Sequence, residues 1–253
     1  MPVELGLTAD RRWGVDVKEV AEAASRAGFS GIGIGAERVD DQTKADLNRR
    51  GLRCHELMAL IVSDNAAATL SSAQQLASKA SVLGAPWVVT VFAATMNQDA
   101  LALVKSCAAM FADAGARMAV EFSPLGSVAS IRDGLQVVAA AGPDRAGLLI
   151  DTWHFFSGDS TWEDLAEVPL ELIGYVQFDD ALPRISNDPM DETMNRRTMP
   201  GDGTFDLERF ATTLLARGWS GLVSVEVLNR DLAMLPVAEF ARLAYASSAR
   251  YWL

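Results

Sequence analysis

The segment from residue 118 to residue 181 decides the fold: it begins with MAVEFS (118–123), continues through GLLIDTWH (147–154) and ends with YVQFDDA (175–181). Each of these three runs is apolar and has the length of a buried strand. The stretches between them are amphipathic and long enough for a helix. Strands that alternate with helices predict a parallel sheet whose strands are joined by helical crossovers.

The same alternation extends over the whole chain of 253 residues. The further apolar runs are VELGL (3–7), GIGIG (31–35), LRCHELMAL (52–60), WVVTVF (87–92) and LVSVEVL (222–228). Several amphipathic stretches close on a glycine, such as Gly28, Gly84 or Gly218, where a helix C-cap glycine belongs. Eight strands alternating with helices predict an α/β fold, a (β/α)8 TIM barrel, as a single domain over residues 1–253.

A doubly wound open sheet is the alternative architecture. Such sheets usually bind a nucleotide through a glycine-rich fingerprint. The run GIGIG (31–35) lacks the third glycine of G-x-G-x-x-G at the required offset, so the barrel is favoured. The only long irregular stretch is predicted at residues 182–204, and in a barrel it would overhang the mouth of the site.

Composition excludes several classes of protein. The formal net charge of −11 disfavours a nucleic-acid partner, because non-specific affinity for phosphate backbones needs clustered Lys and Arg. No apolar run reaches the length of a membrane span, and the first residues become charged too early for a secretory signal. Cys54 and Cys107 form no CxxC pair, so we expect reduced thiols and a cytoplasmic protein. No lysine lies at a strand end, which argues against Schiff-base chemistry.

Four polar residues lie near the ends of separate apolar runs: Glu121, Asp151, Gln177 and Glu226. Period-two alternation places them on the mixed faces of their strands, so we expect them to point into the barrel near its catalytic end. Each buried acid could be satisfied by a neighbouring arginine. None of the four strands contains Lys or Arg, however, and four oxygen donors together favour a shared divalent metal ion.

The order of several motifs identifies a family. The sequence resembles the xylose-isomerase-like barrel superfamily, the sugar phosphate isomerase/epimerase group related to endonuclease IV. The motifs that carry the resemblance are VEFSPLGSV (120–128), LLIDTWHFFSGD (148–159), YVQFDDA (175–181), RRTMPGDGTFDL (196–207) and VSVEV (223–227). The resemblance implies that Glu121, Asp151, Gln177 and Glu226 bind one Mn2+ or Mg2+ ion, and that Glu121 and Glu226 also transfer protons.

Further roles follow from the resemblance. His154 matches a D-x-x-H motif and is expected to be an acid, a base or a substrate contact, at a point where the strand has already turned into its loop. Arg197 precedes a P-G-x-G turn and is expected to bind a carboxylate or phosphate group of the substrate. By its residue type rather than by the resemblance, Trp153 is a candidate for an apolar wall of the substrate pocket, although large aromatic side chains are more often part of the core. Asp180 is expected to orient a ligand or Arg197.

The third strand carries two adjacent candidates, His55 and Glu56. Alternation does not decide which of the two faces the lumen. Glu56 is nevertheless placed among the expected substrate contacts.

The resemblance implies proton abstraction next to a carbonyl, through an enediolate. The leading prediction is a metal-dependent isomerase or epimerase of a sugar, sugar phosphate or keto-polyol. Gln177 stands where better-known members have histidine and is similar to 3-dehydroshikimate dehydratases, so a dehydratase or lyase is the alternative. An amide oxygen favours Mg2+ or Mn2+ over Zn2+.

A catalytically inactive binding module is a remote alternative. The endonuclease branch is disfavoured by the acidic charge and by a total of only two histidines. A small-molecule substrate is expected, with no nucleic acid and no membrane partner. Homo-oligomers are common among members of the family.

Overall fold

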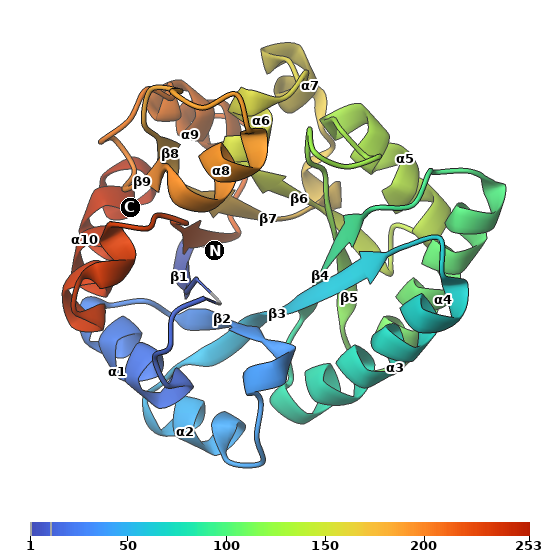
Figure 1. Ribbon diagram of the computed structural model, residues 1–253, viewed down its shortest axis with the longest axis horizontal. Coiled ribbons are helices and arrows are strands. Elements are labelled where there is room, and N and C mark those ends of the chain that lie inside the picture. The colour runs from blue at the N-terminus through green and yellow to red at the C-terminus, as the bar shows by residue number, and fades with distance from the viewer. Residues whose placement is uncertain (1, 11) are drawn as a thin grey trace.

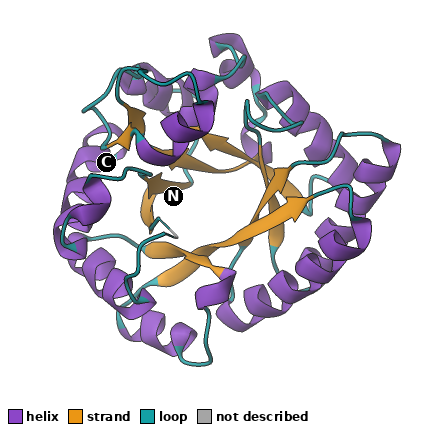
Figure 2. Ribbon diagram, viewed as in Figure 1, coloured by secondary structure: helices purple, strands orange, loops and turns teal. Residues whose placement is uncertain are grey.

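Eight parallel strands close into a barrel in the computed structural model, which describes residues 2–10 and 12–253 (Figures 1 and 2). Hydrogen-bonded neighbours follow the order β1, β10, β7, β6, β5, β4, β3 and β2 around the ring. The strands are β1 (Glu4–Thr8), β2 (Gly31–Gly35), β3 (Arg53–Val62), β4 (Trp87–Phe92), β5 (Arg117–Glu121), β6 (Ala146–Asp151), β7 (Ile173–Phe178) and β10 (Leu222–Glu226). The predicted TIM barrel is confirmed, and each strand overlaps the apolar run expected to form it.

Helices surround the barrel, as Figure 2 shows. They are α1 (Val17–Ala27), α2 (Thr43–Arg49), α3 (Ala66–Leu83), α4 (Gln98–Asp113), α5 (Ile131–Ala141), α6 (Thr152–Ser157), α7 (Trp162–Glu167), α9 (Leu207–Leu215) and α10 (Val237–Trp252), with 3-10 turns η1 (Ala36–Arg38), η2 (Leu170–Leu172) and η3 (Leu232–Met234). Gly28 and Gly84 end α1 and α3 with φ of 106° and 70°. These left-handed conformations explain why glycine closes these helices. None of the helices in the described ranges is both long and apolar enough to cross a membrane.

The glycines of GIGIG in β2 make room in the barrel lumen. Ile32 and Ile34 belong to the main hydrophobic core. A Cβ atom on Gly33 would lie 2.3 Å from Thr8 Oγ1 and 2.5 Å from Glu56 Oε1. The absence of a side chain at Gly33 therefore leaves space for polar groups of the two neighbouring strands. This packing explains the glycine without a nucleotide-binding role.

The stretch at residues 182–204 is more ordered than predicted. It contains helix α8 (Pro189–Asn195), and strand β9 (Arg197–Thr198) pairs in antiparallel fashion with β8 (Asp180–Ala181). Asp188 caps α8 and Pro189 occupies its first turn, which are local start signals for a helix. The expectation of a wholly irregular loop was wrong, because so short a strand pair depends on tertiary contacts rather than on a run of apolar residues.

Candidate functional site

Glu121, Asp151 and His154 come together at the carboxyl ends of strands β5 and β6. One ligand atom from each of the three residues lies within 4.8 Å of the other two. His154 Nε2 is 3.1 Å from Glu121 Oε1 and 4.0 Å from Asp151 Oδ2. Two carboxylates and an imidazole at this separation are a donor set that suits a divalent cation.

The D-x-x-H spacing has a structural explanation in the start of helix α6. Asp151 ends β6 and is the N-cap of α6, and its Oδ1 accepts a hydrogen bond from the His154 backbone nitrogen at 3.1 Å. His154 thus lies in the first turn of a helix rather than in a loop. His154 was predicted to lie beyond the regular strand, and it does. The helical turn brings its imidazole to within 4.0 Å of the Asp151 carboxylate.

Gln177 lies beside Asp151, since the two residues are register partners in β7 and β6. Its Nε2 donates to Glu56 Oε2 at 3.4 Å. Its Oε1 is buried and has no hydrogen-bond partner among the residues that the structure describes. A buried acceptor without a donor is costly. A bound cation would supply the missing partner.

Glu226 ends β10, next to Thr8 of β1 in the strand register. Burial raises the pKa of Glu226 well above its usual value, and the carboxylates of Glu121, Glu56 and Asp151 add to the shift against the opposing influence of Arg197. Burial and the neighbouring carboxylates therefore disfavour the charged form of Glu226. This electrostatic crowding is what a divalent ion would relieve.

Arg197 supplies a counter-charge from outside the barrel strands. Its Nη1 donates to Asp151 Oδ2 at 2.7 Å and to Asp179 Oδ2 at 2.8 Å, and it lies 3.6 Å from Glu226 Oε2. Burial alone would lower the pKa of Arg197, but the three carboxylates outweigh it and raise the pKa above its usual value. Arg197 also lines a cavity of about 500 Å³. Its contact with an anionic group of the substrate stays a prediction.

Asp179 is a residue of this site that the sequence analysis did not single out. Burial and the nearby Asp151 raise its pKa to about 7, although Arg197 acts in the opposite direction. Its Oδ1 accepts from the Thr152 hydroxyl at 2.6 Å. The signal was available, because alternation already places Asp179 on the same face of the chain as Gln177.

Asp180 does not orient Arg197, contrary to expectation. Its two carboxylate oxygens accept hydrogen bonds from the backbone nitrogens of Gly201, Gly203 and Phe205 at 2.9 to 3.0 Å. Asp180 therefore holds the turn that follows β9, and Asp179 is the neighbour that pairs with Arg197. The two adjacent aspartates point in opposite directions, as successive residues of an extended chain do.

His55 and Glu56 both reach the lumen, which answers the question that alternation left open. Ile32 pairs with Cys54 and Gly33 pairs with Glu56, so His55 is an additional residue in β3. Such a bulge locally cancels the alternation of side chains. His55 Nε2 lies 2.9 Å from Ser224 Oγ, and the carboxylate of Glu56 is fully buried. The substrate contact predicted for Glu56 stays a prediction.

A cavity of about 500 Å³ opens above these residues. Glu121, His154, Arg197 and Glu226 line it together with apolar side chains. A second cavity of about 420 Å³ shares Glu226 and borders Arg12. The volume suits a small molecule, and charged side chains contribute to the lining.

Trp153 lies behind this cavity rather than among its lining residues. Its ring centroid is 5.4 Å from that of His154 and 5.6 Å from the Arg197 guanidinium carbon. Trp153 also lines a separate pocket of about 380 Å³ with Phe156 and Phe205. The ring thus supports two candidate site residues, and its predicted direct contact with substrate is not tested.

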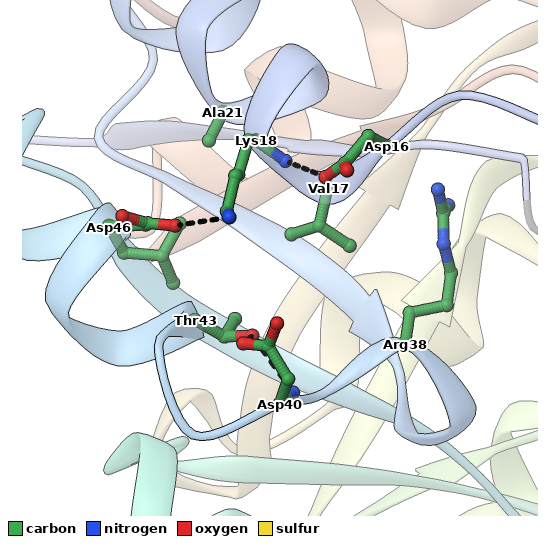
Figure 3. Close-up of a pocket in the computed structure, with 9 residues that line it drawn as sticks. Asp16, Val17, Lys18, Ala21, Arg38, Asp40, Thr43 and Asp46 are labelled. Atoms are coloured by element: carbon green, nitrogen blue, oxygen red, sulfur yellow. Dashed lines mark hydrogen bonds and ion pairs between the residues drawn. The ribbon is translucent and has the colours of Figure 1, made fainter.

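Another pocket, of about 260 Å³, lies on the outside between α1 and α2 (Figure 3). Its acidic groups have local partners: Asp16 caps α1, Asp40 accepts from Thr43, and Asp46 lies 3.6 Å from Lys18. Helix capping, a turn and an ion pair therefore explain the three acidic residues of this pocket. The cavity above the barrel is therefore the stronger candidate site.

A family model for the xylose isomerase-like TIM barrel matches residues 21–252. The chain belongs to this family. This confirms the resemblance inferred from the ordered motifs. The match covers every strand of the barrel except β1.

Two curated relatives share parts of the sequence. A 3-dehydroshikimate dehydratase of Pseudomonas aeruginosa is 34% identical over 100 residues, which are 40% of this chain and 16% of that protein. An inosose isomerase of Halalkalibacterium halodurans is 28% identical over 175 residues, 65% of this chain and 61% of that protein. The matches thus span less than two thirds of either relative.

A crystal structure of the IOLI protein with a bound zinc atom has the same fold. It superposes with a TM-score of 0.83 at 19% identity and covers 98% of both chains. At this level of identity the likeness concerns the fold alone.

Proposed function

We propose that this protein is a divalent-metal-dependent isomerase or epimerase of a small polyhydroxylated ketone. The observation that carries the proposal is the meeting of Glu121, Asp151 and His154 within 4.8 Å, beside a cavity of about 500 Å³. The buried and unpartnered Gln177 Oε1 supports the same site. The inosose isomerase relative acts, by its name, on a substrate of this kind.

Glu121, Asp151, Gln177 and Glu226 would hold the ion. When bound, it would polarise a substrate carbonyl and make the neighbouring C–H bond more acidic. Three carboxylates and an amide are hard oxygen donors, which supports Mn2+ or Mg2+. The zinc atom of the IOLI structure leaves zinc as the competing candidate.

Glu121 and Glu226 are the proposed proton-transfer groups. Both line the cavity, and they come from strands β5 and β10, which β6 and β7 separate. Two carboxylates that approach a substrate from different sides can remove a proton and return one at another position. His154 would contact a substrate oxygen and hold Glu121 in place through their 3.1 Å contact.

Metal analysis of the purified protein, combined with hydrogen exchange, tests the proposal. We expect about one divalent ion per chain, and solvent deuterium should enter a ketose or inosose at the carbon next to the carbonyl only when the metal is present. Glu121→Gln and Asp151→Asn should lose both. Glu171→Gln, an exposed change in η2 before β7, should keep both and serves as the control. Metal-free exchange would contradict the proposal.

A dehydratase is the second candidate. It is favoured by Gln177 and by the relative named 3-dehydroshikimate dehydratase. The same proton abstraction would then be followed by loss of a β-hydroxyl group. An ultraviolet-absorbing enone or aromatic product from such a ketone would identify this reaction, whereas an isomerase would yield deuterated ketone without new absorbance.

A further inference from the structure

A cluster of buried polar side chains lies in the barrel beside the candidate metal ligands. Thr8, His55, Glu56, Tyr175 and Ser224 are each at most 1% exposed. The Ser224 hydroxyl lies 2.7 Å from that of Thr8 and 2.9 Å from His55 Nε2. His55 Nδ1 has no hydrogen-bond partner among the described residues, but the hydroxyl groups and the Glu56 carboxylate all do, and such contacts fix the orientation of the groups that make them.

Glu56 is the acceptor at the centre of this cluster. Its Oε1 accepts from the Thr8 hydroxyl, and its Oε2 accepts from the Tyr175 hydroxyl. Oε2 also accepts from Gln177 Nε2 at 3.4 Å. Both oxygens of Glu56 are therefore engaged by donors of the chain, which distinguishes it from the carboxylates that line the cavity.

The contact with Glu56 decides which end of the Gln177 amide is free. An amide has one face that donates and one that accepts, and only its oxygen can bind a cation. If the amide were flipped, its oxygen would meet the Glu56 carboxylate and its NH2 group would point toward the ligand set. The observed orientation leaves Oε1 as the free, buried end, without a partner in the described part of the chain.

We propose that Glu56 is a positioning residue that holds the Gln177 amide with its oxygen available to the metal. The inference rests on the proposed metal site and deepens it. It gives a reason why a neutral amide stands in a set of carboxylates: the negative charge beside the amide belongs to Glu56. It also assigns to Glu56 a role that requires no contact with substrate.

A double-mutant cycle tests the pairing of Glu56 and Gln177. Mn2+ affinity is measured by calorimetry on chelator-treated protein for the wild type, Glu56→Leu, Gln177→Ala and the double variant. Loss of a residue that orients a metal ligand typically weakens binding on the order of 10- to 100-fold. We expect that loss for Glu56→Leu in the wild-type background, and less than about threefold in the Gln177→Ala background, where no amide remains to be oriented.

Tyr175→Phe is the matched control. It removes the other donor to Glu56 Oε2 but leaves the contact between Glu56 and Gln177. Urea unfolding of the metal-free proteins should show that Tyr175→Phe and Glu56→Leu are both destabilised, because both disturb the buried cluster. Only Glu56→Leu should lose metal affinity. An equal loss in both variants, or an equal effect of Glu56→Leu in both backgrounds, would overturn the proposal.

An exchange of the two groups covers the case in which Glu56→Leu does not fold. Gln177→Glu alone places two carboxylates side by side, and adding Glu56→Gln restores one amide and one carboxylate. The double variant should unfold at a higher urea concentration than Gln177→Glu, and the absence of this rescue would contradict the pairing. A wild type without metal affinity would refute the proposed function as well. Normal metal binding without coupling would refute only the role of Glu56.

Discussion

Arg197 shows how a single buried cation changes the electrostatics of the site. A metal was expected to supply the whole counter-charge, because the apolar runs that carry the four candidate ligands contain no Lys or Arg. The guanidinium nevertheless reaches Asp151 and Asp179 from β9, at 2.7 and 2.8 Å. Part of the negative charge is thus neutralised by the chain itself, and the crowding around Glu226 is what remains for an ion.

Removal of the Arg197 charge should destabilise the metal-free protein. In Arg197→Met the buried carboxylates of Asp151 and Asp179 lose their partner, which typically costs about 3–5 kcal/mol. Arg196→Met is the control: the Arg196 side chain is 20% exposed, and its partner Glu192 keeps two backbone N–H donors, so a loss of about 1 kcal/mol is expected. Urea unfolding measures both. Similar losses for the two variants would show that Arg197 is not a structural counter-ion.

At the residue scale, strand alternation placed three candidate residues at strand ends but did not reveal the partners of their side chains. Glu121, Asp151 and Glu226 end their strands as expected, because the side-chain direction follows from a local period of two. The bulge at His55 and the reach of Arg197 are tertiary features without a comparable local signal. Asp179 was missed although its face was known, since its partner lies 18 residues further along the chain.

At the scale of elements, the chain from β8 to the turn after β9 depends on Asp180. Its carboxylate accepts four backbone N–H groups: those of Ala181, Gly201, Gly203 and Phe205. This anchor holds the turn that follows β9. The motif RRTMPGDG was visible in the sequence. Asp180, however, was expected to orient a ligand or Arg197, whereas it binds the backbone of the turn in this motif.

Asp180→Ala should therefore loosen this turn. The unpaired donors cost on the order of 1–3 kcal/mol each where they stay buried, so we expect about 2–4 kcal/mol in the free energy of unfolding. Hydrogen exchange of a peptide spanning residues 199–206 should become faster. Asp188→Ala removes only the exposed N-cap of α8 and should cost about 1 kcal/mol without this change in exchange. Unchanged protection of the turn in Asp180→Ala would contradict the assignment.

For the whole molecule, the period of the apolar runs was enough to predict the barrel. Eight runs separated by amphipathic helices admit few closed architectures, and the helix ends were marked by glycines such as Gly28. Strand order followed because each parallel strand packs beside its predecessor. The excursion between β7 and β10 was not predictable in the same way, because β8 and β9 have two residues each and no period.

Metal binding should stabilise the entire barrel, because the proposed ligands belong to four different strands. An ion that binds only the folded state adds about 2.7 kcal/mol at a free concentration one hundred times its dissociation constant. The thermal midpoint of chelator-treated protein should therefore rise with added Mn2+. Asp151→Asn should abolish most of the rise, while Glu171→Gln should retain it. A rise of equal size in Asp151→Asn would place the ion elsewhere.

The glycines of β1 and β2 have a consequence for engineering. A Cβ on Gly6 would lie 2.5 Å from the His55 ring, and one on Gly33 would collide with both Thr8 and Glu56. Side chains of neighbouring strands thus share one fixed volume inside the barrel. A designer who wishes to install new chemistry there has to alter residues 8, 33 and 56 as one unit, enlarging one only as far as another is made smaller.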